Sequence, residues 1–126
     1  MSKAHAARLY PAAVKPVNAA ELAWNAAARS GATPVAAAPS ADALAQALVT
    51  SDSRLLRLAL AYPPAASDLR ALVNADARAE GDLRSVIAQN AATLPGWTQQ
   101  MGQDNAKSAT AADAVLADLG LPPPSP

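Results

Sequence analysis

Cysteine is absent from this chain of 126 residues, which excludes disulfide bonds, thiolate chemistry and metal sites held by cysteine. Phenylalanine is absent too, aromatic residues make up 3% of the chain, and the one histidine is His5. The five glycines are scattered, and the motifs of serine hydrolases, zinc proteases, phosphate loops and calcium loops are missing. We therefore expect a protein that is not an enzyme and that needs no cofactor or metal.

The chain also lacks a net charge, because ten basic residues balance ten acidic ones. A neutral chain has no field that would steer it toward nucleic acid, and no apolar run is long enough to cross a bilayer. We expect no nucleic-acid partner, no small-molecule ligand and no membrane insertion. The predicted location is the cytoplasm, or a virion if a phage encodes the chain. A targeting segment is an open alternative for residues 1–20, which hold three basic residues before the first acid.

Alanine dominates what is present. Hydrophobic residues make up 52% of the chain, and 36 residues are alanine. Alanine has the best intrinsic helix propensity and no side-chain entropy to lose, so this composition favours helices that approach one another closely. The sequence predicts an all-α fold with a thin core, and its length is typical of one domain.

Eleven prolines divide the chain, since proline removes a backbone donor and disfavours helix at the residue before it. Residues 1–17 are predicted to be an extended N-terminal arm, 18–120 a single helical domain, and 121–126 a polyproline-like tail. Helix starts are predicted near capping residues and at Pro95, with Pro63–Pro64 ending the helix that begins near Ser53, Gly102 ending the one from Pro95, and Gly120 ending the last helix. These starts lie near Asn18, Ser40, Ser53, Ser67, Asp82, Pro95 and Thr110.

A short motif recurs within the predicted domain. LVTSD at 48–52 returns as LVNAD at 72–76, and Arg57 and Arg84 each precede an apolar segment. This part of the chain, about 40–104, resembles the leucine-rich-repeat-variant family, a relative of HEAT repeats. The first copy matches that family's pattern at Asp52, Arg57, Ala61, Pro63, Leu69, Leu72 and Asp76, and the second matches it at Arg84, Ala88, Asn90, Trp97 and Asp104. The resemblance implies action through protein contacts and no catalytic residue.

Two architectures follow from these patterns. One is a small irregular helical bundle, and the other is a short HEAT-like α-solenoid; each would have five to six helices, the extended arm and the proline-rich tail. In an alanine-rich chain, ordinary amphipathic helices can produce the same spacing as a repeat, so both architectures stay open.

Charged side chains cluster between two predicted helices, where Asp76, Glu80 and Asp82 alternate with Arg78 and Arg84. Such a cluster could hold a small ligand or carry out acid–base chemistry, in which case it should form a polar pocket with perturbed pKa values. The alternative is structural, because acidic residues are favoured at helix N-termini.

Candidate residues for a protein interface are large apolar, aromatic or arginine side chains without an obvious partner. Tryptophan, tyrosine and arginine are enriched at the centres of interfaces. The candidates are Leu9, Tyr10, Trp24, Trp97, Arg54 and Arg57.

The sequence thus favours a non-enzymatic protein–protein binding module, a small accessory or structural subunit of a larger bacterial or phage assembly. The first alternative is a helical domain that binds a small ligand, or acts as an enzyme, through the Asp76–Arg84 cluster. The second alternative is a nucleic-acid-binding regulator that uses its arginines.

Overall fold

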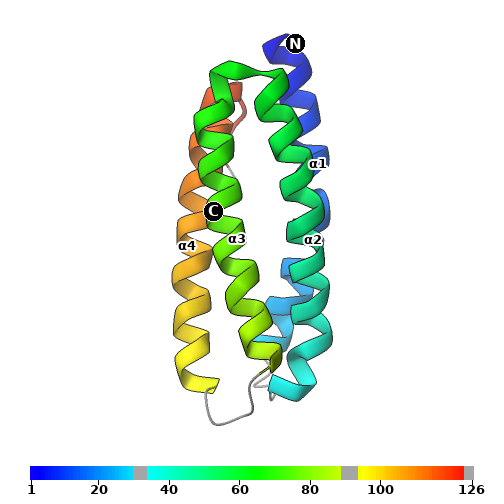
Figure 1. The fold of residues 1–126 in the computed structure, drawn as a ribbon, viewed down its shortest axis with the longest axis vertical. Helices are drawn as coiled ribbons and strands as arrows, with labels where there is room; N and C mark the ends of the chain where they lie inside the picture. The colour runs from blue at the N-terminus through cyan, green and yellow to red at the C-terminus, as the bar shows by residue number, and fades with distance from the viewer. Residues whose placement is uncertain (30–33, 89–93, 124–126) are drawn as a thin grey trace.

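The computed structural model describes residues 1–29, 34–88 and 94–123, and every regular element in these residues is helical. Four α-helices follow one another: α1 (Lys3–Arg29), α2 (Pro34–Ala61), α3 (Ala66–Ala88) and α4 (Leu94–Leu119). A short 3₁₀ helix, η1 (Pro63–Ala65), joins α2 to α3 (Figure 1). The predicted all-α class is confirmed. The five to six helices and the solenoid are not confirmed in the described residues.

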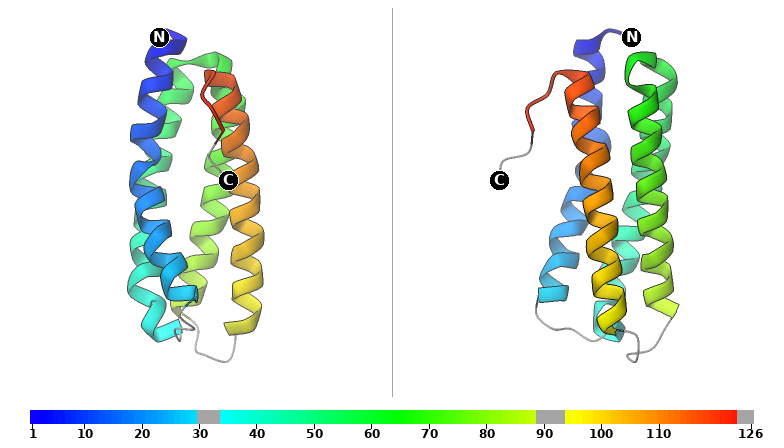
Figure 2. Two further views of the ribbon diagram at one scale, coloured as in Figure 1. Left: turned by 180° about the vertical axis from the view of Figure 1, so that it is seen from behind. Right: turned by 90° about the vertical axis from the view of Figure 1, so that its left-hand side faces the viewer.

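The helices run alternately down and up, so consecutive helices are antiparallel (Figure 1). Helix α2 packs against α1 and α3, and α3 packs against α4, whereas α1 and α4 make few contacts with each other. Residues 121–123 turn back beside the end of α4 instead of continuing its axis (Figure 2). The bundle is therefore well closed on three sides and only loosely closed on the fourth.

Helix α1 corrects the prediction of an extended arm over residues 1–17. It begins at Lys3, where the backbone amide of His5 donates a hydrogen bond to Ser2 Oγ (3.1 Å), and it continues through Pro11 and Pro16. A proline inside a helix costs about 3 kcal/mol. That cost is offset by a buried stripe at helical spacing, formed by Ala6, Tyr10, Ala13 and Val17.

Helix α2 joins two segments that were predicted to be separate helices divided near Ser53. Serine inside a helix can hydrogen-bond to the carbonyl one turn back, and Ser53 Oγ donates to the carbonyl oxygen of Val49 (3.2 Å). The buried face also continues across the predicted break, from Leu48 through Ser51 to Leu55. Packing of this face thus outweighs the local capping signal.

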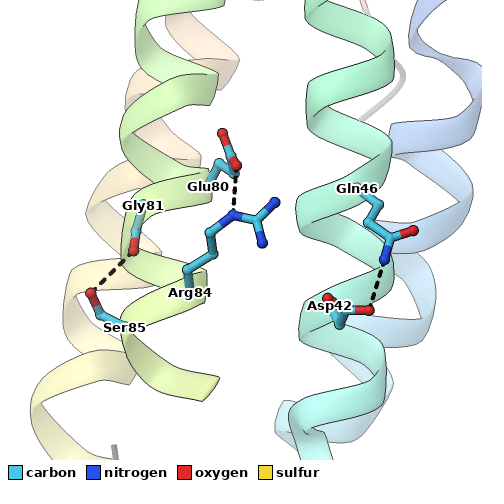
Figure 3. Close-up of polar contacts among 6 residues, drawn as sticks. All are labelled: Asp42, Gln46, Glu80, Gly81, Arg84 and Ser85. Atoms are coloured by element: carbon cyan, nitrogen blue, oxygen red, sulfur yellow. Dashed lines mark hydrogen bonds and ion pairs between the residues drawn. The ribbon is translucent and has the colours of Figure 1, made fainter. Parts of the chain in front are cut away.

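Helix α3 likewise runs through the predicted break near Asp82, and α4 runs through the predicted break between Gly102 and Thr110. Ser85 Oγ donates to the carbonyl oxygen of Gly81 (3.1 Å; Figure 3), and Leu83 is fully buried beyond it. The predicted break at Pro63–Pro64 is confirmed, because α2 ends at Ala61 and η1 begins at Pro63. The predicted helix end at Gly120 is also confirmed. Gly120 has φ = 67°, and the amide of Leu121 donates to the carbonyl oxygen of Leu116 (2.9 Å).

The core consists of two clusters stacked along the bundle. The first surrounds Tyr10, Leu55, Leu69 and Val115, where all four helices contribute, and the second surrounds Trp24, Leu44, Leu48 and Leu83. Between them lie two buried polar residues, Ser51 and Asp76. The apolar core is therefore interrupted by a polar layer about midway along the helices.

Candidate functional site

A groove runs between α1 and α4 on the loosely closed side of the bundle. Its volume is about 740 Å³, and it spans α1 from Tyr10 to Glu21 and α4 from Asn105 to Leu116. Eleven residues of helix rise about 16 Å, so each wall is about three turns long. The walls are mostly apolar, and small side chains on α4 keep the groove wide. Wall residues include Val14, Val17, Ala109, Ala112 and Leu116.

The floor of the groove is polar where it reaches the layer between the two core clusters. Ser51 from α2 and Asp76 from α3 line the groove together with Ser108 from α4. Ser108 Oγ donates a hydrogen bond to Asp76 Oδ1 (3.1 Å), and Asp76 is 6% exposed. Ser51 is 0% exposed, and its Oγ has no hydrogen-bond partner among the described residues. We call Ser51, Asp76 and Ser108 the polar floor.

Asp52 on α2 adjoins the polar floor, because its carboxyl group lies beside that of Asp76. Burial, followed by hydrogen bonding to Asp76 and the charges of Asp76 and Glu80, raises the pKa of Asp52 to about 8. Burial also raises the pKa of Asp76, although the hydrogen bonds with Asp52 and Ser108 act in the opposite direction. At neutral pH Asp52 is therefore protonated and can donate to the Asp76 carboxylate.

Glu21 extends the acidic character of the floor to the α1 wall. It lines the groove, and its pKa is raised first by burial and then by the charge of Asp76. A second hollow of about 210 Å³ lies beside the groove, reaches Trp24 and Leu83, and shares Glu21, Asp76 and Ser108 with it. The acidic groups thus lie where two hollows meet.

A second pair of carboxyl groups lies elsewhere, between α3 and α4. Burial, followed by a hydrogen bond with Asp82 and the charge of Asp82, raises the pKa of Asp104 to about 6. Asp104 is 1% exposed, and Gln100 Nε2 donates to its Oδ1 (3.2 Å). Neither Asp82 nor Asp104 lines the groove or the hollow beside it. This pair therefore has the same chemistry as Asp52–Asp76 without an opening toward a ligand.

The Asp76–Arg84 cluster does not converge on one pocket. Asp76 lies on the floor of the groove, whereas Arg84 Nε forms an ion pair with Glu80 Oε1 (2.7 Å) one turn away on α3, with the arginine half exposed (Figure 3). Asp82 instead faces Asp104. The expected perturbed pKa is present at Asp76, but the arginines that were expected beside it are not part of the groove lining.

Three of the predicted interface residues come together at a different place. Leu9, Arg54 and Arg57 line a shallow hollow of about 290 Å³ between the first part of α1 and the last part of α2. Tyr10 and Trp24 are both buried, at 4% and 5% exposed, because each anchors one of the two core clusters. Tyr10 was predicted to lie in the extended arm, and its burial follows from the helical conformation of that segment. The side chain of Trp97 lies outside the described residues.

Sequence reasoning missed the polar floor, although one signal could have found part of it. The recurring motifs LVTSD and LVNAD place Asp52 and Asp76 at equivalent positions of two helices, and these two carboxyl groups meet in the fold. The two copies lie on α2 and α3, which are antiparallel and pack against each other (Figure 1). Ser108, in contrast, lies in no recurring motif, so only the fold reveals its contact.

The described residues offer neither a metal site nor a membrane-spanning helix. No group of three or more histidine, aspartate or glutamate side chains there could hold a metal ion. No described helix is long and apolar enough to span a membrane. Comparison of the chain with protein-family models, with curated proteins and with solved structures gives no match.

Proposed function

We propose that this protein is a non-enzymatic protein-binding module, and that it takes an amphipathic helix of a partner protein into the groove between α1 and α4. The observation that carries the proposal is the open fourth side of the bundle, where two helices of opposite direction stand apart over about three turns with apolar side chains between them. An amphipathic helix lies in such a groove with its apolar face inward.

The size of the groove supports a helix as the occupant. Ala109 and Ala112 line one wall and Val14 and Val17 line the other, so the side chains along this part of the groove are small to medium in size. Filling the groove would also cover the floor from water and complete the enclosure of the bundle. In this view the protein is the small accessory subunit that the sequence predicts, and its helices form the scaffold for the partner.

The test places a photo-crosslinking benzoyl-phenylalanine at Ala109, which is exposed and lines the groove, and at Ala77, which is exposed on α3 away from it. We expect crosslinking in native cells from position 109 to one helical segment of one partner, and none from position 77. A synthetic peptide of that segment should then bind the full chain. The variant Ala109→Trp, which fills the groove, should bind it at least about tenfold more weakly with unchanged helicity. Equal crosslinking from both positions, or none from position 109, would contradict the proposal.

A further inference from the structure

The polar floor lacks a positive charge of its own. Lys15 is the basic side chain that lines the groove, but it is exposed, and within the described residues it forms no ion pair with Asp76 or Glu21. Glu21 and Asp76 therefore line the groove, and Asp52 lies beside Asp76, without an ion pair to a cation in the part of the chain that the structure describes. Each of the three has a raised pKa, which is the expected response of carboxyl groups buried near one another without a neighbouring cation.

A second observation points to a ligand independently of the acidic groups. Ser51 is fully buried, lines the groove, and has an Oγ with no hydrogen-bond partner among the described residues. A buried polar atom without a hydrogen-bond partner destabilises the fold, so native proteins nearly always satisfy such an atom. The hydroxyl oxygen of Ser51 can accept a hydrogen bond from a donor that enters the groove.

The geometry points to a specific occupant for the polar floor: the lysine or arginine side chain of the helix that docks between α1 and α4, with its cationic end bound by Ser51, Asp76 and Glu21. This inference rests on the proposed function, since it states which side chain of the docked helix the same groove prefers. The carboxylate and hydroxyl oxygens of the floor can accept hydrogen bonds, and an ammonium matches them because it carries three donors and no acceptor. The apolar walls suit the methylene stem of such a side chain.

The position of the floor also suits one basic residue in the middle of a helix. Ser51, Asp76 and Ser108 lie between the two core clusters, and apolar side chains such as Val14 and Leu116 line the groove farther along. A helix with apolar residues at most inward positions and one lysine or arginine among them would match this lining. A helix without that basic residue would bury the carboxyl groups without compensation.

The experiment compares two synthetic peptides with the full-length protein. Both are acetylated amphipathic helices of about 16 residues, matched to the groove length, and they differ at one central inward position, which is lysine in one and norleucine in the other. Binding is measured by calorimetry, and the site is located from the amide NMR signals of Ser51, Asp76 and Ser108. We expect the lysine peptide to bind about tenfold or more tightly than the norleucine peptide.

Variants show whether the floor causes this preference. Asp76→Asn keeps an oxygen that can accept a hydrogen bond from Ser108 but removes the charge. The lysine and norleucine peptides should therefore bind this variant with nearly equal affinity. Glu21→Gln, at the edge of the floor, should reduce the preference for lysine less. Asp104→Asn is the matched control, because it alters the other buried carboxyl pair, away from the groove, and it should leave the preference unchanged.

The remaining outcomes separate this inference from the proposed function. Equal binding of both peptides in the groove would overturn the selection of a cation while leaving a helix-binding groove. If neither peptide binds but n-hexylammonium shifts the Ser51, Asp76 and Ser108 signals more than hexanol does, the floor is a small-amine site, which overturns the docked helix as the source of the cation. If hexylammonium also fails, the cation site itself is wrong.

Discussion

The bundle contains two pairs of buried carboxyl groups that differ in their surroundings more than in their chemistry. Asp52 and Asp76 join α2 to α3 at the floor of an open groove, whereas Asp82 and Asp104 join α3 to α4 and line no part of that groove. In both pairs burial is the largest cause of the raised pKa. The comparison shows that a perturbed pKa alone does not mark a binding site. Both pairs also contain buried oxygens without a hydrogen-bond partner, so it is the groove, into which the Ser51 hydroxyl opens, that distinguishes the first pair from the second.

The largest expected effect is a loss of stability as pH rises, to which the Asp52–Asp76 pair should contribute most. A carboxyl group whose pKa is raised in the folded state binds its proton more tightly there than in the unfolded chain. Its contribution to the free energy of unfolding is therefore complete below its unfolded pKa of about 4 and is lost as pH rises toward the folded value of about 8 for Asp52. We expect the melting temperature to fall by about 5 to 10 °C between pH 5 and pH 9.

Circular dichroism melting curves at several pH values measure this effect, and Asp52→Asn provides its control. In that variant the amide can donate a hydrogen bond to Asp76 without titrating, so most of the fall between pH 6 and pH 8 should disappear. A wild-type melting temperature that stays constant or rises over this range would contradict the assigned protonation of the pair.

The second prediction concerns the pair outside the groove. Because burial raises the pKa of Asp104 to about 6, its carboxylate is unfavourable at pH 7.5. Asp104→Asn should raise the melting temperature at pH 7.5 by about 3 to 5 °C, on the order of 1 kcal/mol. At pH 4.5, where the wild-type group is largely protonated, the gain should be small. Differential scanning calorimetry at the two pH values checks the prediction, and an equal gain at both would show that the effect is not electrostatic.

The third prediction compares the two neutral side chains that donate hydrogen bonds to the carboxyl pairs. Ser108 donates to Asp76 from a partly buried position, whereas Gln100 donates to Asp104 from an exposed one. Ser108→Ala should lower the free energy of unfolding by about 1 kcal/mol, and Gln100→Ala should lower it by roughly half as much. Urea denaturation measures both. If Gln100→Ala lowers the free energy of unfolding more than Ser108→Ala does, burial of the donor does not decide how much each hydrogen bond contributes.

The smallest expected effect tests the helix that carries one member of each pair. Gly81 lies within α3 between Asp76 and Asp82, and a Cβ added there would meet no atom within 4 Å. Gly81→Ala should raise the free energy of unfolding by roughly 0.5–1 kcal/mol because alanine favours helix. The matched control is Gly120→Ala, at φ = 67° and with Lys3 Cε 3.2 Å from the new Cβ, which should destabilise instead. Urea denaturation decides between the two signs.

The sequence predicts the helical class of this fold, the break at Pro63–Pro64 and the helix end at Gly120, because alanine content, paired prolines and a left-handed glycine act locally. It does not predict how far each helix extends. Pro11, Pro16 and the segment around Ser53 carry local signals against a continuous helix, and burial of Tyr10, Leu48 and Leu55 outweighs those signals through contacts that form only in the bundle.

The candidate site is harder to predict from the sequence than the fold. Asp76 is recognisable as part of a charged cluster, but its partners Asp52 and Ser108 lie 24 and 32 positions away and on other helices. The spacing along one helix wrongly groups Asp76 with Arg84, which forms an ion pair with Glu80 one turn away. Which acids meet depends on the register between helices, and neither composition nor periodicity fixes that register.

The central claim is that the floor of the groove between α1 and α4 selects a cationic side chain, and it is tested most directly by the lysine peptide titrated into the wild-type, Asp76→Asn and Asp104→Asn proteins. The account predicts that the peptide shifts the amide signals of Ser51 and Ser108 in the wild type and in Asp104→Asn, and that Asp76→Asn weakens binding about tenfold or more. Equal binding to all three proteins would contradict it.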